Sequence, residues 1–424
     1  MLTPTTGSHS FAPSQRIPLL DSMRGICLLG ILLMNIQTYT LYDFISAKEA
    51  AAMHWDNLSS LLSETFFLDI FVQGQFYTIY SFLFGLGFYL MLEKNTRLEL
   101  NGNKLYIRRL TIMFFFGVIH SALWMGDVLH VYAIFGIPLI YFQKKKTAVI
   151  FRWAAGVFLC GILLDVFRTL FFPPLPPSHS QELFSKDTLH MINTFQKGPF
   201  TEILKIQYDK LLKITIAITR STMTGYEHII ILFLLGLIAG KTRFFHRITE
   251  LKPAIKRAVL IILPFALALK VIACLPILNV HFLSPQQAVY EQLFIKMIRF
   301  TGILLMAFVY IGIITLLLHK SNSRIAFWLS NAGRLGLTNY LMQTVICMLL
   351  FYPFGLKLTG KLTLLQSLLL AVSIFIVQVI CSNIWLRYYN MGPMEAIWRR
   401  FTYGKQPVRA GITTEKTNGL SPIE

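Results

Sequence analysis

Long apolar runs separated by short polar segments dominate the pattern of this chain. Runs of roughly 18 to 25 mostly apolar residues are long enough to cross a bilayer as helices. The pattern therefore predicts an all-α, polytopic integral membrane protein with about ten transmembrane helices. We expect these helices at residues 17–40, 66–92, 107–124, 127–142, 148–172, 214–240, 258–279, 295–318, 333–352 and 362–387.

The polar segments between these runs alternate in charge. Lysine and arginine concentrate in segments 93–109, 143–152, 241–257, 320–324 and 399–405. With ten spans, all five segments fall on one side, and the positive-inside rule places that side and both termini in the cytoplasm. Because the cations lie in short loops, the formal net charge of +19 indicates membrane topology and no nucleic-acid partner.

The apolar run that begins at Ile17 is longer than the core of a signal peptide, about 7 to 15 residues, so we expect a retained first helix. The five cysteines lie in apolar runs without pairing or metal-ligand spacing, and we expect no metal. The predicted organisation is a cytoplasmic segment at 1–16, an N-terminal membrane bundle at 17–172, a periplasmic proline-containing loop at 173–213, a C-terminal membrane bundle at 214–405 and a polar, disordered tail at 406–424.

The most concentrated ionisable chemistry lies in a predicted tight hairpin between two spans. His120 lies in the first apolar run, and Asp127 and His130 follow in and after the turn. Ionisable groups at membrane depth are costly and usually functional. A carboxylate beside an imidazole fixes its tautomer and raises its basicity, which suits a general base. The alternative is structural: Asp127 caps a helix and His120 is simply hydrogen-bonded.

Several other polar residues in or near the spans have both a structural and a functional interpretation. Arg24, Arg108 and Arg109 either set topology and local ion pairs or anchor the phosphates of a nucleotide-like ligand. Asn35 in the first span is typical of an interhelical hydrogen bond or of a substrate contact. Asp69, near the opposite boundary, either stabilises helix packing or orients a histidine and accepts a proton.

The chain resembles the bacterial YeiB-like inner-membrane family over nearly its whole length. The residues that carry the resemblance are Leu20, Asp21, Arg24, Gly25, Gly30 and Asn35, then 82–87 and 126–130, then Asn331, Gly333, Arg334, Thr338, Asn339, Tyr340 and Gln343, and finally Gly392, Pro393, Glu395, Trp398 and Arg399. The resemblance implies a multi-pass protein of the bacterial inner membrane. The C-terminal half of that family is a domain of unknown function, and some members carry a transport label.

The N-terminal half is also distantly similar to the heparan-α-glucosaminide N-acetyltransferase group of membrane enzymes. The shared pattern comprises Arg16, Asp21, Arg24-Gly25, Asn35 and Asp69. This resemblance implies transfer of an acyl group from cytosolic acyl-CoA to an acceptor across the membrane. That group uses a histidine between its first two spans, for which His54 is the candidate here. His130 and Val131 replace the group's Gln-Arg pair, a departure from its pattern.

Two functions from different classes follow, besides a third in which the protein is a non-catalytic membrane component of an envelope complex. In the first, the protein is an acyltransferase: acyl-CoA binds near Arg24, Arg108 and Arg109, and one of His54, His120 or His130 activates an envelope sugar or lipid, with Asp69 or Asp127 orienting it. In the second, it is a transporter or permease whose polar residues line a substrate path. The bilayer is the expected partner, and an oligomer is compatible with either function.

Overall fold

The computed structural model describes residues 17–171, 186–220, 227–278, 280–284, 287–319 and 323–404, with side chains omitted for 214–220 and for residue 227. The predicted segments 1–16 and 406–424, and the proline-rich start of the predicted loop at 173–185, lie outside this range. The described residues are helical and contain no strand. The class predicted from the apolar pattern is therefore confirmed.

Seventeen α-helices and two short 3-10 helices make up the described chain. They are α1 (Pro18–Thr40), α2 (Ala47–Ala52), α3 (Leu58–Phe71), α4 (Gln75–Arg97), α5 (Gly102–Leu123), α6 (Leu129–Gly136), α7 (Leu139–Phe142), α8 (Thr147–Phe171), α9 (Lys186–Lys197), α10 (Phe200–Arg220), α11 (Glu227–Lys241), η1 (Phe244–His246), α12 (Ile248–Cys274), η2 (Leu275–Leu278), α13 (Ala288–Leu318), α14 (Arg324–Arg334), α15 (Gly336–Phe351), α16 (Leu364–Tyr388) and α17 (Pro393–Tyr403).

Seven helical segments of the described chain are long and apolar enough to cross a membrane. They are α1, α3 with α4, α5, α8, α12 with η2, α13 and α16. The pair α14–α15 would make an eighth, although it is bent by 79°. These helices support a membrane protein, while the count of about ten spans and the side on which the termini lie stay predictions.

The structure differs from three of the predicted spans. Residues 127–142 form two short helices, α6 and α7, because Pro138 lacks the backbone N–H that a continuous helix needs. The predicted span at 214–240 corresponds to the end of α10 and to the separate helix α11. The predicted span at 333–352 begins inside α14 and turns sharply at Leu335 into α15.

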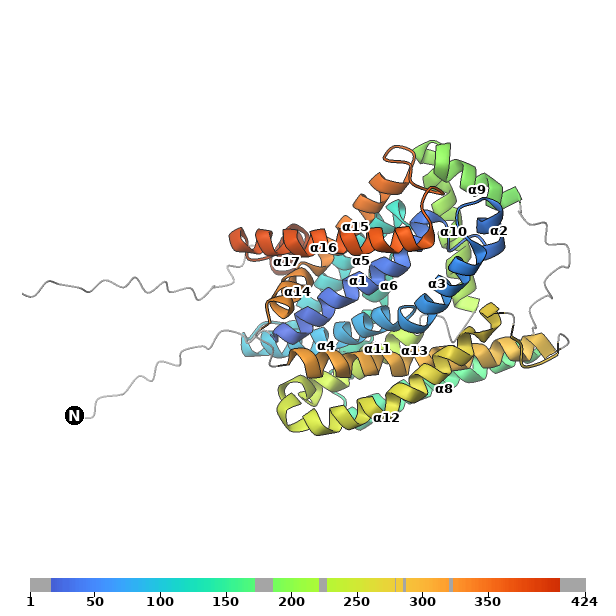
Figure 1. Ribbon diagram of the computed structural model, residues 1–424. Coiled ribbons are helices and arrows are strands. Elements are labelled where there is room, and N and C mark those ends of the chain that lie inside the picture. The colour runs from blue at the N-terminus through green and yellow to red at the C-terminus, as the bar shows by residue number, and fades with distance from the viewer. Residues whose placement is uncertain are drawn as a thin grey trace, which may run out of the picture.

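Helix α1 lies at the centre of the bundle and is crossed tightly by α14. A Cβ added to Gly333 would lie 1.8 Å from the carbonyl oxygen of Asp21, so only glycine allows this approach. Ser22 donates a hydrogen bond to the carbonyl of Ala326 across the same crossing, at 3.0 Å. Figure 1 shows α1, α5, α14 and α16 in one part of the bundle and α8, α12 and α13 along its lower edge.

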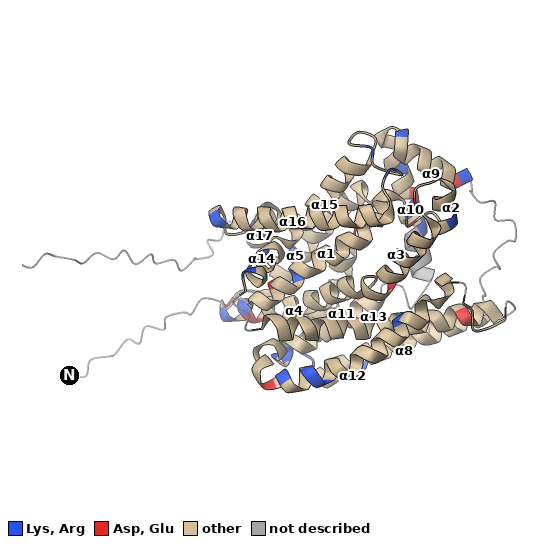
Figure 2. Ribbon diagram, viewed as in Figure 1, with Lys and Arg blue, Asp and Glu red and all other residues tan. Residues whose placement is uncertain are grey.

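The described parts of the five cation-rich segments lie toward one end of the bundle, which we call the α17 end (Figure 1). Lys241 donates to the carbonyl of Gln143 at 2.7 Å, and Arg243 pairs with Glu93 at the end of α4. Thr249 and His319 are hydrogen-bonded, and Trp398 of α17 donates to the carbonyl of Arg109. Figure 2 shows lysine and arginine at this end and also at the opposite end, the α9 end, which carries α2 and α9.

Candidate functional site

The candidate site is built on the hairpin formed by α5, the turn at 124–128 and α6. Helix α5 ends at Leu123, and the backbone N–H of Trp124 donates to the carbonyl of His120 as its last hydrogen bond. The two arms touch at Gly117, where an added Cβ would lie 2.2 Å from the backbone nitrogen of His130. Close contact at this glycine brings Asp127 and both hairpin histidines together.

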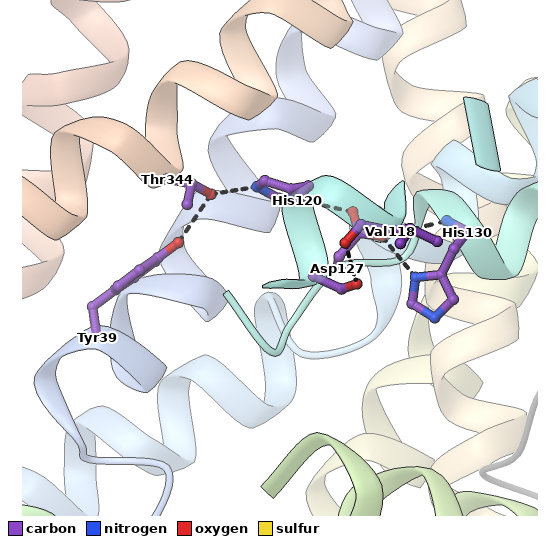
Figure 3. Close-up of polar contacts among 7 residues, drawn as sticks. Tyr39, Val118, His120, Asp127, His130 and Thr344 are labelled. Carbon is purple, nitrogen blue, oxygen red and sulfur yellow. Dashed lines mark hydrogen bonds and ion pairs between the residues drawn. The ribbon is translucent and has the colours of Figure 1, made fainter. Parts of the chain in front are cut away.

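Asp127 bridges two imidazoles. Its Oδ1 lies 2.8 Å from Nδ1 of His120, and its Oδ2 lies 2.8 Å from Nδ1 of His130 (Figure 3). The backbone N–H of His130 also donates to Oδ2, at 3.3 Å. The side chain of Asp127 therefore accepts from a backbone N–H in the first turn of α6 and contacts both imidazoles.

The contacts continue from His120 to two hydroxyl groups on other helices. Nε2 of His120 lies 2.8 Å from Oγ1 of Thr344 on α15, and the hydroxyl of Tyr39 on α1 donates to the same oxygen at 3.0 Å. Figure 3 shows Tyr39, Thr344, His120, Asp127 and His130 joined in sequence by these contacts. We call this set the Asp127 relay.

An ionised Asp127 fixes the direction of the hydrogen bonds in the relay. A carboxylate is only an acceptor, so both imidazoles present Nδ1–H to it. Nε2 of His120 then accepts from the hydroxyl of Thr344, whose oxygen accepts from Tyr39. In the same state, Nε2 of His130 keeps its lone pair, since within the described chain its ring has a hydrogen bond only at Nδ1.

The exposure of the three side chains differs in a way that suits a base. The side chains of Asp127 and His120 are 0% and 3% exposed, whereas that of His130 is 22% exposed. The ring of Trp124 stacks on Tyr39, and the ring of Tyr340 packs against His120, so water is kept from the inner part of the relay. A low local dielectric strengthens the hydrogen bonds to the carboxylate. Of these three side chains, that of His130 is the most exposed.

Gly117→Ala should destabilise the protein by about 1–3 kcal/mol, because the added methyl would overpack the contact with His130 and Asp127. The matched control is Gly156→Ala in α8, where an added Cβ meets nothing within 4 Å. The melting temperatures of both variants in detergent test this. An equal melting temperature for Gly117→Ala and the native protein would contradict the tight hairpin contact.

The remaining predicted catalytic residues lie outside the relay. Asn35 precedes Tyr39 by one helical turn on α1, so the two share a face, and its side chain is partly exposed. His54 is exposed in the connection between α2 and α3 and has a positive φ of 58°. Neither residue forms a hydrogen bond with a relay member in the described chain. Asn35 is thus near the site, and His54 is not joined to it.

Asp69 belongs to a different cluster of charges, formed by α3, α12 and α13. Its Oδ2 lies 3.4 Å from Arg299 and accepts from the thiol of Cys274 at 3.7 Å. Lys270 donates to the carbonyl of Gln73 and Arg299 to that of Ala273, so both cations lie at helix ends whose carbonyls favour positive charge. This geometry supports a packing role for Asp69.

The three predicted phosphate-binding arginines differ in exposure and in partners. Arg108 is exposed, whereas the guanidinium of Arg109 lies 4.0 Å from the ring centre of Trp398 and contacts the sulfur of Met91. Arg24 pairs with Asp21 at 2.6 Å and is close enough to Arg109 to interact electrostatically. No carboxylate within the described residues forms an ion pair with Arg109. Arg24 and Arg109 together therefore offer N–H donors and positive charge to an anion.

Sequence reasoning missed Tyr39 and Thr344. Tyr39 lies four residues after Asn35, so helical spacing placed it on the face already singled out. Thr344 lies 224 residues from His120 in the chain, and no local pattern links them. Among the described residues, no group of three or more histidine, cysteine, aspartate or glutamate side chains could hold a metal ion.

Comparison with known proteins places the chain among uncharacterized relatives. The family model described as "Protein of unknown function (DUF418)" matches residues 239–405, which include Thr344 but not the hairpin. An uncharacterized 39.9 kDa protein from the amylase 3' region of Bacillus acidopullulyticus is 32% identical, over 93% of this chain and 96% of its own. Uncharacterized protein YxaH of Bacillus subtilis is 28% identical, over 92% and 95%.

A third relative is uncharacterized protein YeiB of Escherichia coli, which is 24% identical over 90% of this chain and 95% of its own. No solved structure matches the chain. The alignments with these relatives extend over both the hairpin half and the half matched by the family model.

Proposed function

The chain belongs to the YeiB-like family of uncharacterized proteins, and from this premise we propose that it is a membrane-embedded acyltransferase. The donor is an acyl-CoA, and the acceptor is a hydroxyl or amine on an envelope sugar or lipid. The single observation that carries the proposal is the bridging of His120 and His130 by Asp127, which leaves Nε2 of His130 available as a base. The proposal also draws on the resemblance inferred from the sequence pattern Arg16, Asp21, Arg24-Gly25, Asn35 and Asp69.

In the proposed reaction, Nε2 of His130 takes the proton of the acceptor as its oxygen or nitrogen attacks the thioester carbonyl. Asp127 stabilises the imidazolium that forms, as a carboxylate does for a general-base histidine. The carbon–sulfur bond breaks, and the leaving thiolate takes the proton back from His130. His120 and Thr344 hold Asp127 in place from the other side.

The donor would enter from the α17 end. Arg24 and Arg109 would bind the phosphates of acyl-CoA, since a guanidinium forms paired charged hydrogen bonds with phosphate. Arg109 and His120 lie on the same helix, α5, and their separation of eleven residues corresponds to about 16 Å of helix. An elongated donor bound by its phosphates at Arg109 would direct its acyl end toward the Asp127 relay.

The proposed function requires a defined orientation of the protein in the membrane. We place the α17 end in the cytoplasm of a bacterium, the α9 end on the periplasmic side, and the protein in the inner membrane as a multi-pass chain of about ten spans. The bilayer is then a partner and acyl-CoA is cytosolic. The positive-inside rule and the contacts among the described parts of the cation-rich segments at one end support this orientation.

Release of free thiol from acetyl-CoA by the purified protein in proteoliposomes tests the proposal. We expect release that depends on an added amino sugar or on a lipid with a free hydroxyl, and that is lost in a folded His130→Ala variant. Uptake of a labelled solute without acyl-CoA, together with no thiol release for any donor, would overturn the proposal in favour of a transporter.

A further inference from the structure

A surface at the α17 end exposes arginine together with large apolar side chains. It comprises Arg387 at the end of α16 and Ile397, Arg400 and Phe401 of α17, and we call it the terminal surface; Phe327 and Trp328 of α14 are exposed at the same end of the bundle (Figure 1). Phe327 and Phe401 are 61% and 58% exposed. Ile397 and Phe401 are four residues apart, so they share one face of α17, and Arg400 lies beside them.

The terminal surface continues the lipid-facing side of α16. Exposed apolar residues follow one another along this apolar helix, and its last turn carries Arg387. Helix α17 begins five residues after α16 ends, and its apolar side chains are exposed together with a cation. This combination is typical of a helix that lies in the headgroup region of a bilayer, where tryptophan and arginine are also enriched.

The charge of the terminal surface selects the kind of headgroup. Among the described residues of α14, α16 and α17, the only carboxylate is that of Glu395. Glu395 is directed into the protein, where it accepts from the backbone nitrogens of Leu337 and Thr338 at 2.8 and 3.1 Å. No acidic side chain of these helices therefore offsets Arg387 and Arg400, and the surface attracts anions.

We propose that the terminal surface binds anionic phospholipid in the leaflet at the α17 end, and that this lipid holds α17 against the bundle. The inner side of α17 carries Trp398, which packs on Arg109 and donates to its carbonyl, and Glu395, which caps α15. Helix α15 in turn carries Thr344 of the Asp127 relay. Lipid on the outer side of α17 stabilises the contacts on its inner side. This inference does not rest on the acyltransferase proposal.

The first test measures lipid retention without any acyl donor. The native protein and an Arg387→Gln/Arg400→Gln variant are purified from vesicles that contain phosphatidylglycerol and phosphatidylcholine, and bound lipids are identified by native mass spectrometry. Each basic residue near an anionic surface contributes about 1 kcal/mol, so we expect roughly thirty-fold weaker phosphatidylglycerol binding for the double variant. The phosphatidylcholine signal should stay unchanged.

The matched control is Lys256→Gln/Arg257→Gln, which removes two exposed cations of α12 near the same end of the bundle. It should retain phosphatidylglycerol as the native protein does. Equal retention by all three proteins, or equal loss in both double variants, would overturn a specific surface on α16 and α17. Specific binding of an acidic protein or a nucleic acid in place of lipid would overturn it as well.

The second test asks whether the lipid acts on α17 itself. Hydrogen–deuterium exchange of the amides in Pro393–Tyr403 is compared in nanodiscs of phosphatidylcholine with and without phosphatidylglycerol. We expect slower exchange with the anionic lipid, and no such effect in Ile397→Ser/Phe401→Ser, which removes the apolar contact. Exchange that is the same in both lipids would show that the lipid does not hold α17, and would overturn that part of the proposal.

Discussion

His130→Ala should lower acyl transfer by about 10²–10⁴-fold, the usual contribution of a positioned general base. Of the three ionisable side chains of the hairpin, only that of His130 is more than a few per cent exposed. Its Nε2 keeps a lone pair when Asp127 is ionised. The fold should persist, because Asp127 keeps its contact with His120. Turnover and melting temperature measured on the same sample separate these two effects.

Asp127→Asn tests whether the hairpin groups act as one unit. An amide presents an N–H to one of the two imidazoles, which forces that ring into the opposite tautomer. We expect a loss of turnover, and we expect the double variant Asp127→Asn/His130→Ala to be no slower than His130→Ala alone, since residues that act together do not contribute additively. Multiplied losses in the double variant would mean that the two residues act independently.

His54→Asn is the matched control for the loss of a histidine. Asparagine tolerates the positive φ of this exposed position, so the substitution removes the imidazole without straining the backbone. Native turnover is expected, because His54 has no hydrogen bond to the relay in the described chain. If His54→Asn were as slow as His130→Ala, the base would have to be sought in the connection between α2 and α3.

The hairpin could be predicted from sequence because its chemistry is local. Asp127 and His130 are three residues apart, and only the end of the first helix and the short hairpin turn separate His120 from Asp127. A compact hairpin therefore brings the three side chains close together. The other half of the relay could not be predicted, because Tyr39 and Thr344 reach His120 only through the packing of α1 and α15 on α5. Distant contacts of this kind leave no periodic signal in one sequence.

The contacts of Asp69 could not be predicted for the same reason. A carboxylate beside an apolar run is compatible with catalysis and with packing, and only the positions of α12 and α13 bring Arg299 and Cys274 to it.

The breaks within predicted spans have a related cause. Pro138 is visible in the sequence, but the bend of 79° between α14 and α15 arises where Glu395 of α17 caps the new helix.

Arg109→Ala should weaken binding of CoA about a hundred-fold or more, whereas Arg108→Ala should leave it near the native value. Two charged hydrogen bonds contribute about 1.5–3 kcal/mol each, and the guanidinium of Arg109 has no carboxylate partner in the described part of the chain. Arg108 is the matched control, since it is the adjacent cation of the same helix and its side chain is exposed.

Calorimetric titration of each variant with CoA gives the measurement, and Arg109→Lys refines it. Lysine keeps the charge but lacks the planar fork that binds phosphate through two parallel hydrogen bonds, so its affinity should lie between those of the native protein and Arg109→Ala. Equal weakening by Arg108→Ala and Arg109→Ala would indicate a diffuse attraction by the cations of the α17 end. In that case the contact with Trp398 of α17 would not distinguish Arg109 from Arg108 as a phosphate-binding residue, and the donor would have to bind elsewhere.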